Sequence, residues 1–357
     1  MKAKRNSLIA KELLKEVKLD KDQSMLEISG LSLDSRNVSD KNIFFAIKGN
    51  EKNGNDFIEE ALQRGASLIL SDEREIKKKN VIYYSNLREY LGIVSSRYYG
   101  SPSKKLKVFC VTGTNGKTSC VEAISQLSTL LGISCGYIST IGVSLDGKEM
   151  SQDSKLTTPD SLVIQKTFSD MVEEDIKYSA LEVSSHGLSQ SRIVGTSVET
   201  AILTSFSLDH LDFHKTQQNY EFAKKSLFTD FKPKKVILNI DSQFGEGLYK
   251  ELKDFSDNVY SISSYKQADI KVKTKRNSGG LMVNINTPFG LGSFQLKTIS
   301  KYLASNIVCA IVNFLTQGFD IKELCLASEK IVLPKGRMEQ IRINNKSSCF
   351  IDFAHTP

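Results

Sequence analysis

A run of small and polar residues with one lysine, TGTNGKT at positions 112–118, has the composition of a loop that binds phosphate groups. Its glycines let the backbone approach an anion, so that N–H groups of the loop and of a following helix can donate to phosphate oxygens. Lys117 adds a point charge for the outer phosphates, and Thr118 offers a hydroxyl to Mg²⁺. The spacing G-x-x-G-K-T lacks the first glycine of the common nucleotide-binding loop, and Val111 stands in its place. We predict that ATP or GTP binds to Gly113, Thr114, Asn115, Gly116, Lys117, Thr118 and Ser119.

Acidic residues and histidines gather in two further motifs, EVSSHGL at 182–188 and DHLDFH at 209–214. Glu182 lies at the end of an apolar run, where a carboxylate can reach the metal ion on a bound phosphate. His210 and His214 are four residues apart, so a helix would place both on one face. This spacing also allows a zinc site, although no H-E-x-x-H motif surrounds it. All four histidines of the chain fall in these motifs or in residues 352–357: His186, His210, His214 and His355.

The elements that must position these motifs alternate between strands and helices. Residues 108–112 form an apolar, β-branched run before the phosphate loop, and residues 120–131 carry apolar side chains at helical spacing after it. Further strands are expected at 133–138, 178–183, 201–203 and 236–240. This alternation predicts a mainly parallel sheet covered by helices, with the ligand groups beyond the carboxyl ends of the strands. Residues 270–296 instead alternate like antiparallel hairpins, and residues 301–316 are helical again.

Three blocks divide the chain. The first, residues 1–101, is expected to be a small α/β domain that ends at a Gly-Ser-Pro-Ser linker. Its expected elements are strands at 43–47 and 66–70, a helix at 56–64 capped by Asn55 or Asp56, and an N-terminal amphipathic helix with Leu8, Ile9, Leu13, Leu14 and Val17 on its apolar face. The second block, residues 104–332, carries the phosphate loop and the alternating sheet. The third, residues 333–357, begins with a linker and reaches one strand at 348–352, so we expect a chain that stops as a third domain starts.

Composition argues against several classes of protein. The 357 residues carry a formal net charge of +7, with both signs scattered along the chain, so a solvated surface is expected. The sequence lacks a basic stripe with interleaved aromatic residues, which would favour nucleic-acid binding. It also lacks a run of about 18 apolar residues, which would favour a membrane span. The six cysteines form no C-x-x-C pair, which argues against a zinc centre and fits a reducing cytosol. The N-terminus lacks the apolar core of a signal peptide, so we expect a cytoplasmic protein.

Together these motifs resemble the Mur ligases, and within them the MurE-like branch that forms the tripeptide precursor of the cell wall. TGTNGKT is shared by Mur ligases and related folate ligases, whereas EVSSHGL and DHLDFH are typical of that branch. LTTP at 156–159, AKKSLF at 223–228, LDSR at 33–36 and FFAIKG at 44–49 extend the resemblance over the whole chain. The implied fold has a small N-terminal α/β domain that binds the UDP end of the precursor and a central ATP-binding domain with a mainly parallel sheet. A C-terminal Rossmann-like domain would be present here only in its first strand.

The resemblance implies an ATP-dependent ligase that adds meso-diaminopimelate or L-lysine to UDP-N-acetylmuramoyl-L-alanyl-D-glutamate in peptidoglycan biosynthesis. ATP would convert the substrate carboxylate to an acyl phosphate, which the amine of the amino acid attacks. Transfer between anions needs neutralised charge, which Lys117 and two Mg²⁺ would supply. By the same resemblance, Thr118 and Glu182 hold the first Mg²⁺, and His210 and a carbamylated Lys224 help to hold the second. Carbamylation makes the lysine an anion, so that it can bind a metal.

The resemblance also assigns binding residues. The uridine side of the precursor is assigned to Leu33 and Ser35, and its muramoyl-dipeptide to Thr157, Thr158, Ser184, Gln190 and Arg192. The Arg192 guanidinium suits the D-glutamate carboxylate, because its planar fork can donate two parallel hydrogen bonds. Asn306 is assigned to the adenine, and Arg337 and Asp352 to the rest of the nucleotide. The expected partners are the UDP-linked precursor and a free amino acid, bound by a monomer.

A few positions depart from the family pattern. Ser205-Phe206 stands where Asn-Leu is usual, Lys215 replaces a glycine, and Ser242 replaces an aspartate. The larger departure is the missing C-terminal domain, which would bind the amino acid and carries the motif that separates diaminopimelate users from lysine users. We therefore expect this chain to bind the precursor without ligating. The alternatives are a sibling Mur ligase, a folylpolyglutamate-type ligase, a nucleotide-dependent switch and a non-catalytic precursor-binding fragment.

Overall fold

The chain forms two compact units, each assembled from segments that are not continuous in sequence. The computed structural model describes residues 8–49, 52–150, 156–333, 336, 339–343 and 348–352. Unit 1 comprises Met1–Pro102, Asp160–Ser169 and Gln190–Thr196, and unit 2 comprises Ser103–Pro159, Asp170–Ser189 and Ser197–Pro357. In the described residues no helix combines the length and the apolar character needed to cross a membrane.

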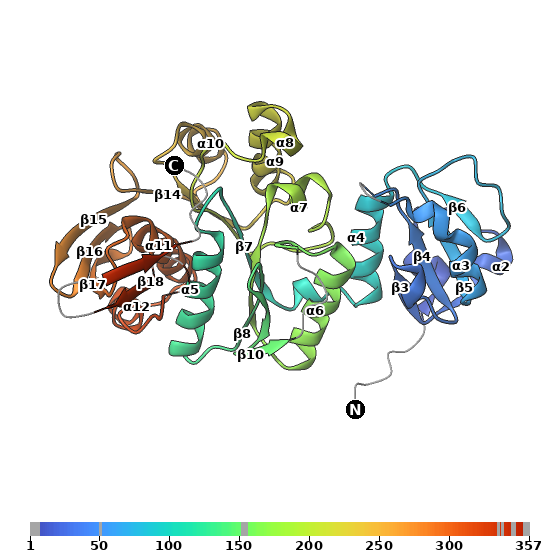
Figure 1. Cartoon of the computed structure of the whole chain (residues 1–357), viewed down its shortest axis with the longest axis horizontal. Coiled ribbons are helices and arrows are strands. Elements are labelled where there is room, and N and C mark those ends of the chain that lie inside the picture. The colour runs from blue at the N-terminus through green and yellow to red at the C-terminus, as the bar shows by residue number, and fades with distance from the viewer. Residues whose placement is uncertain are drawn as a thin grey trace. The chain divides into compact units, whose positions relative to one another are not determined.

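Unit 1 is built on a parallel sheet of four strands in the order β3-β4-β5-β6 (Figure 1). Alternate side chains of β4 enter two different cores, Ile43 and Phe45 on one face and Phe44 and Ala46 on the other. Burial on both faces explains why this strand is a continuous apolar run in the sequence. The elements before the linker are β1 (Leu8–Ile9), α1 (Ala10–Leu13), α2 (Lys21–Ser24), β2 (Glu27–Ile28), β3 (Gly30–Ser32), η1 (Ser35–Asn37), β4 (Asn42–Ala46), η2 (Gly54–Phe57), α3 (Ile58–Gln63), β5 (Ala66–Ser71), β6 (Val81–Tyr83) and α4 (Leu87–Tyr98).

Two local predictions for this unit were wrong. The expected N-terminal helix is reduced to α1, because Leu8 and Ile9 pair with β2 as an antiparallel strand. Pairing with another segment overrides the helical spacing of the apolar residues. The helix expected at 56–64 starts as the 3₁₀ turn η2, and its cap is Asn53, whose side chain accepts the Asn55 N–H at 3.1 Å.

Two segments that the sequence analysis included in the central block pack with unit 1. Leu162, on α6 (Ser161–Glu173), packs against the apolar cluster that contains Leu87, Leu91 and Val94. The backbone of the other segment approaches α4 so closely that a Cβ on Gly92 would lie 2.5 Å from the Val194 carbonyl oxygen. The unit boundary therefore follows packing between segments rather than position along the chain.

Unit 2 is built on an eleven-stranded sheet in the order β10-β9-β8-β11-β7-β12-β13-β14-β15-β16-β17. Its middle strands, from β8 to β15, run parallel, and antiparallel hairpins extend the sheet at both ends. The expected parallel alternation and the hairpins at 270–296 are therefore confirmed. The strands are β7 (Lys107–Thr112), β8 (Cys135–Ser139), β9 (Gly142–Leu145), β10 (Lys148–Met150), β11 (Tyr178–Glu182), β12 (Thr200–Leu203), β13 (Lys235–Asn239), β14 (Val259–Ser263), β15 (Ile270–Asn277), β16 (Gly280–Thr287) and β17 (Gly290–Leu296).

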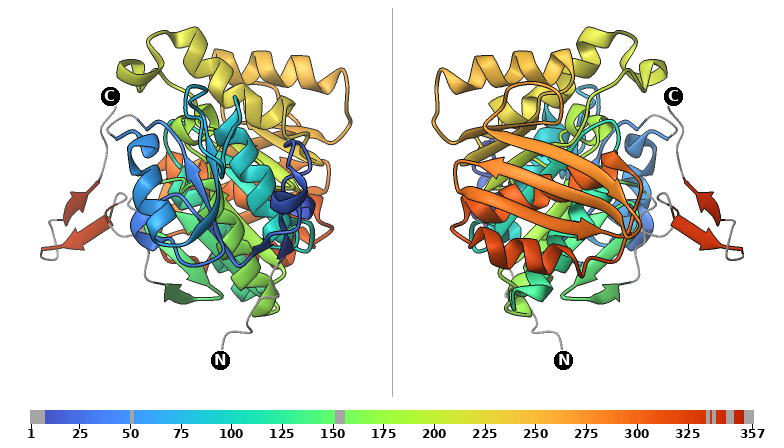
Figure 2. Two further views of the ribbon diagram at one scale, coloured as in Figure 1. Left: turned by 90° about the vertical axis from the view of Figure 1, so that its right-hand side faces the viewer. Right: turned by 90° about the vertical axis from the view of Figure 1, so that its left-hand side faces the viewer.

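Helices cover this sheet, and the apolar core lies between them and the strands. One large apolar cluster joins the sheet to α5, α11 and α12, with Ile124, Ile307 and Leu324 among its buried members. The antiparallel extension β15–β17 lies beside these helices in the right-hand view of Figure 2. The helices are η3 (Pro102–Lys104), α5 (Lys117–Leu130), α7 (Ser185–Ser189), α8 (Leu211–His214), α9 (Gln217–Thr229), α10 (Gln243–Lys253), α11 (Lys301–Thr316) and α12 (Ile321–Ser328). The helix expected at 301–316 is confirmed with the same bounds.

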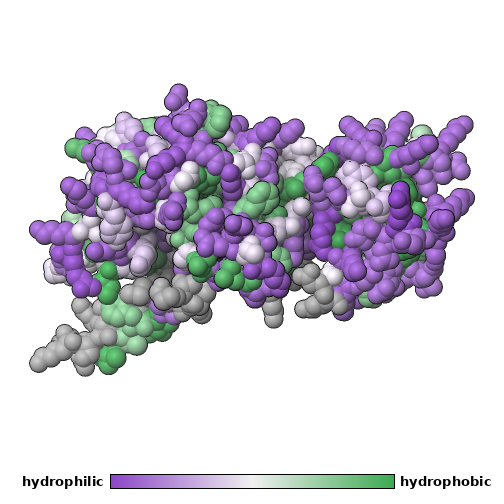
Figure 3. Space-filling model, turned by 90° about the horizontal axis from the view of Figure 1, so that it is seen from above, coloured by the Kyte–Doolittle hydropathy of each residue, from purple (hydrophilic) through white to green (hydrophobic). Residues whose placement is uncertain are grey.

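The last described elements are β18 (Glu339–Arg342) and β19 (Ser348–Ile351), which form a separate antiparallel pair. The strand expected at 348–352 is thus present, although its partner was not predicted. Hydrophilic residues, drawn in purple, dominate the face shown in Figure 3, in agreement with the solvated surface expected from the scattered charges.

Candidate functional site

The phosphate loop connects β7 to α5, as the sequence predicted, and two of its glycines are required by close contacts. Gly116 precedes α5 with φ 85°, in the left-handed region that favours glycine. A Cβ at Gly116 would overlap the carboxamide of Asn306 on α11, and a Cβ at Gly113 would overlap the Thr204 hydroxyl. The fold thus holds Asn306, the residue assigned to adenine, directly against the loop.

Lys117 and Thr118, at the start of α5, reach two different partners. The Lys117 amine donates to the carbonyl oxygens of Gly113 and Thr114, both at 3.0 Å. The buried Thr118 hydroxyl donates to the Glu182 carboxylate at 3.1 and 3.3 Å. Glu182 is brought there because β11 pairs in parallel with β7, opposite Val111.

The carboxylate of Glu182 is almost completely buried, at 2% exposure, among neutral donors. Besides the Thr118 hydroxyl, the Thr140 N–H donates to it at 3.0 Å. A buried carboxylate next to a hydroxyl is a set of hard oxygen donors, which is the ligand chemistry that Mg²⁺ prefers. These residues therefore fit a magnesium ion beside the phosphate loop.

Three residues assigned to the precursor surround Glu182 in unit 2. The Thr158 hydroxyl donates to the Glu182 carbonyl oxygen at 2.9 Å and accepts the Ser184 N–H at 2.9 Å. Thr157 accepts a hydrogen bond from the Thr140 hydroxyl at 3.1 Å. The end of β11 thus connects the metal-binding candidate to the candidate precursor residues.

Lys224, on α9, is a buried lysine at 1% exposure. Its amine donates to the Gly113 carbonyl oxygen at 2.8 Å and lies 4.8 Å from the centre of the Tyr220 ring. Burial, followed by the charge of Lys117, lowers the pKa of Lys224 well below its usual value, and Asp209 only partly opposes this. A lowered pKa increases the share of the neutral, nucleophilic form of the amine.

Three histidines lie together next to these residues. The His186 ring centre is 4.8 Å from that of His210 and 5.6 Å from that of His214. Burial lowers the pKa of His210, with Lys117 and Lys224 acting in the same direction. His355 lies outside the described residues. The clustering in space is therefore shown for the other three histidines.

Of the two histidines four residues apart, only His214 lies within a helix, and His210 is the N-cap of that helix. His210 precedes α8 with φ 53°, so it ends the incoming loop rather than belonging to the helix. Over the described ranges, no group of three or more His, Cys, Asp or Glu side chains is arranged to hold a metal ion. The alternative of a zinc site therefore has no support from these side chains.

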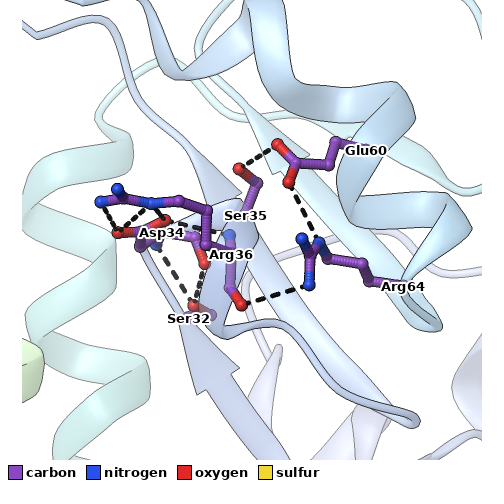
Figure 4. Close-up of polar contacts among 6 residues, drawn as sticks. All are labelled: Ser32, Asp34, Ser35, Arg36, Glu60 and Arg64. Atoms are coloured by element: carbon purple, nitrogen blue, oxygen red, sulfur yellow. Dashed lines mark hydrogen bonds and ion pairs between the residues drawn. The ribbon is translucent and has the colours of Figure 1, made fainter.

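Unit 1 contains a cavity of about 340 Å³ at the position of the residues assigned to uridine. Leu33 and Ser35 line it, together with Phe44, Lys52 and Glu60. Figure 4 shows the Ser35 hydroxyl pointing to the Glu60 carboxylate, to which it donates at 2.7 Å. This hydrogen bond lowers the pKa of Glu60, so the cavity wall carries an ionised acid at neutral pH.

Gln190 and Arg192 also belong to unit 1. The Arg192 guanidinium donates to the Gln190 side-chain oxygen at 2.6 Å, and Asp160 lies 3.8 Å from it. The guanidinium is therefore held in a fixed orientation by its neighbours. Of the remaining assigned residues, Asp352 is exposed after β19, and Arg337 lies outside the described residues.

Sequence reasoning missed several residues that contact the phosphate loop or Glu182. Tyr220 is buried with its hydroxyl 2.9 Å from the Thr114 hydroxyl, and it lies four residues before Lys224, a spacing that places both on one helix face. Thr140 and Ser205 contact Glu182 and Asn115, respectively, from loops. No periodicity marks these two, because a loop carries no repeating pattern.

Comparisons with known proteins agree with this arrangement. The Mur ligase middle domain matches residues 111–313, and the catalytic domain of the Mur ligase family matches residues 27–99. UDP-N-acetylmuramoyl-L-alanyl-D-glutamate--2,6-diaminopimelate ligases are similar in sequence. That of Rickettsia bellii is 37% identical over 336 residues, covering 92% of this chain and 68% of the relative. That of Buchnera aphidicola from Acyrthosiphon pisum is 33% identical over 345 residues, covering 92% and 69%.

Solved structures show the same relationship. A UDP-N-acetylmuramoyl-L-alanyl-D-glutamate--2,6-diaminopimelate ligase superposes with a TM-score of 0.87 at 27% identity, covering 98% of this chain and 72% of that one. MurF from Acinetobacter baumannii has a TM-score of 0.68 at 15% identity, covering 98% and 74%, and shows the shared fold alone. These matches lend no support to the expectation of a truncated chain, which stays a prediction. The family matches and the sequence identities show that the chain belongs to the Mur ligase family of ATP-dependent ligases.

Proposed function

We propose that this chain uses ATP to join 2,6-diaminopimelate to UDP-N-acetylmuramoyl-L-alanyl-D-glutamate in peptidoglycan synthesis. The names of relatives that are 33–37% identical over most of the chain support this substrate pair. The observation that carries the proposal is the convergence of α5, β11 and α9 on one loop. Thr118 meets Glu182 at 3.1 Å on one side of it, and Lys224 meets Gly113 at 2.8 Å on the other.

Each of these side chains then has a task in phosphoryl transfer. Lys117 would bind the outer phosphates of ATP, since its amine already lies at the loop carbonyls and can exchange them for phosphate oxygens. Thr118 and Glu182 would hold one Mg²⁺, and His210 and a carbamylated Lys224 would hold another. Bound Mg²⁺ would neutralise charge on the phosphates. The buried amine of Lys224 suits carbamylation, because a neutral lysine can add CO₂.

Unit 1 carries residues at two places that would contact the precursor. Leu33 and Ser35 would contact uridine, and the guanidinium of Arg192 would bind the D-glutamate carboxylate through two parallel hydrogen bonds. Thr157, Thr158 and Ser184 would hold the part of the dipeptide near the phosphate loop. The proposal includes Mg²⁺, a monomeric state and a cytoplasmic location, which stay predictions.

The test is ATP-dependent phosphate release in the presence of the UDP-linked dipeptide, with diaminopimelate and lysine offered separately and the product weighed by mass spectrometry. Phosphate release that needs diaminopimelate supports the proposal. Phosphate release that needs lysine instead would show that lysine is the amino acid added. Binding of ATP and precursor is measured on the same samples by calorimetry. A chain that binds both without turnover would agree with the expectation of binding without ligation. A chain that binds neither overturns the proposal.

A further inference from the structure

Thr204, Ser205 and Ser207, which follow β12, hold the phosphate loop through hydrogen bonds. The Thr204 hydroxyl donates to the Asn115 carbonyl oxygen at 2.6 Å, and the Ser207 N–H donates to the Thr114 hydroxyl at 3.0 Å. Ser205 makes three such contacts. Its carbonyl oxygen accepts the Thr114 N–H at 3.0 Å, and its hydroxyl oxygen accepts the Asn115 N–H at 3.0 Å while donating to the Asn115 carbonyl at 3.0 Å.

These contacts involve the groups that a phosphate loop presents to its ligand. A loop of this type binds phosphate through successive backbone N–H groups and the lysine amine. In this chain the N–H groups of Thr114 and Asn115 both donate to Ser205, and the Lys117 amine donates to loop carbonyls. A nucleotide that uses these donors must therefore displace hydrogen bonds that already exist.

The Ser205 hydroxyl differs from the Thr204 hydroxyl and the Lys224 amine in the type of loop group to which it binds. The hydroxyl of Thr204 and the amine of Lys224 donate to carbonyl oxygens of the loop, which a phosphate does not need. The Ser205 hydroxyl instead accepts an N–H group, which a phosphate oxygen can use. Without it, the loop would keep the Thr204, Ser207 and Lys224 contacts and so its general course.

We propose that Ser205 is a positioning residue that acts as a latch: its hydroxyl holds the Asn115 N–H of the phosphate loop and competes with a nucleotide for it. The proposal rests on the proposed use of ATP at this loop. It concerns a residue of this chain in particular, because Ser205 is one of the positions that depart from the family pattern. The latch lowers nucleotide affinity and stabilises the unliganded loop, two effects that a merely structural serine would not combine.

Ser205→Ala removes the hydroxyl and tests both the effect on nucleotide affinity and the effect on the stability of the loop. The affinity for ADP in the presence of Mg²⁺ should rise by about two- to tenfold, the range that one exchanged hydrogen bond allows. The melting temperature of the unliganded protein should fall. Ser205→Cys keeps the shape of the side chain, although sulfur is larger than oxygen, but it offers a weak acceptor, so its affinity should lie between the two. The matched control is Ser256→Ala, since Ser256 accepts the Asn258 N–H at 3.2 Å in an exposed loop elsewhere in the unit.

Calorimetry with ADP and thermal unfolding without it give both readouts on the same variants. Tighter ADP binding with a lower unliganded melting temperature, absent from Ser256→Ala, supports the latch. Unchanged or weaker ADP binding by Ser205→Ala and Ser205→Cys, with the unsubstituted protein binding normally, overturns it. Failure of the unsubstituted protein to bind ADP would instead overturn the proposed function. If Ser205→Ala does not fold, the order of affinities between Ser205→Cys and the unsubstituted protein decides.

Discussion

The amine of Lys224 lies 2.8 Å from the carbonyl oxygen of Gly113, so helix α9 and the phosphate loop share a hydrogen bond across 111 positions of sequence. This contact places a buried amine at the point where the outer phosphates of a nucleotide are expected. Helix α9 thus presents Lys224 to the loop rather than to solvent. The first two predictions concern this amine.

Lys224 should carry a carbamate when the protein is equilibrated with bicarbonate. Its lowered pKa increases the neutral share of the amine, and a neutral amine adds CO₂. Carbon-13 NMR with labelled bicarbonate should show one protein carbamate signal, which Lys224→Met removes. Lys225→Met is the control, because Lys225 is more exposed and pairs with Glu251 at 2.6 Å. A signal that survives Lys224→Met, or no signal at all, contradicts this prediction.

Stability in CO₂-free buffer should depend on pH through the same amine. Because the pKa of Lys224 is lower in the folded than in the unfolded chain, folding is less favourable below the unfolded pKa than above it. The free energy of unfolding should rise as pH increases from the folded pKa towards the unfolded value of about 10.4. Urea titrations over this window should show a smaller rise for Lys224→Met than for Lys225→Met, and parallel curves would refute the argument.

Glu182→Gln should weaken the effect of Mg²⁺ on nucleotide binding. The substitution keeps the size of the side chain and an acceptor for the Thr118 hydroxyl, but it removes the negative charge that attracts the cation. The Mg²⁺ concentration needed for half-maximal ATP binding should rise at least about tenfold, as for other losses at metal sites. Glu246→Gln on α10 is the control, since Glu246 pairs with Lys250 and Lys266. An equal Mg²⁺ requirement in both variants would remove Glu182 from the metal site.

Two glycine substitutions should change stability in opposite directions. Gly116→Ala places a Cβ in a left-handed residue and against the Asn306 carboxamide, so it should cost at least about 1–2 kcal/mol. Gly247→Ala lies on α10 with open space around its Cβ, so it should add about 0.5–1 kcal/mol through helix propensity. Urea unfolding compares the two, and a neutral Gly116→Ala would show that the loop can relax.

Two substitutions in unit 1 should distinguish the binding of the uridine end of the precursor from the binding of its dipeptide end. Ser35→Ala removes the hydroxyl at the cavity wall and should weaken the binding of UDP and of the whole precursor alike, by about three- to tenfold. Arg192→Lys replaces a bidentate donor and should weaken the binding of the dipeptide precursor by about tenfold or more, leaving UDP unchanged. Calorimetry with each ligand checks this. A loss of UDP binding in Arg192→Lys would show that the arginine acts on the unit as a whole.

Much of the fold follows from local pattern. The run at 108–112, the glycine-containing turn and the helix after it are contiguous, so their order and type could be read from spacing, and the same holds for α11. The segments at 8–9 and 54–57 were misread because their form depends on a distant partner strand and on the Asn53 cap. Short elements contain too few residues for a period to outweigh such contacts.

The sequence by itself determined the chemistry that the protein can offer: a phosphate loop, a carboxylate at a strand end, histidines in one motif and a lysine in another. These are properties of residue type and local order, which do not need the fold. The tertiary structure alone decided that Lys224 is buried and meets Gly113, and that Ser205 takes the Asn115 N–H. Burial and long-range hydrogen bonds depend on which elements the parallel sheet places side by side, and no local spacing encodes that.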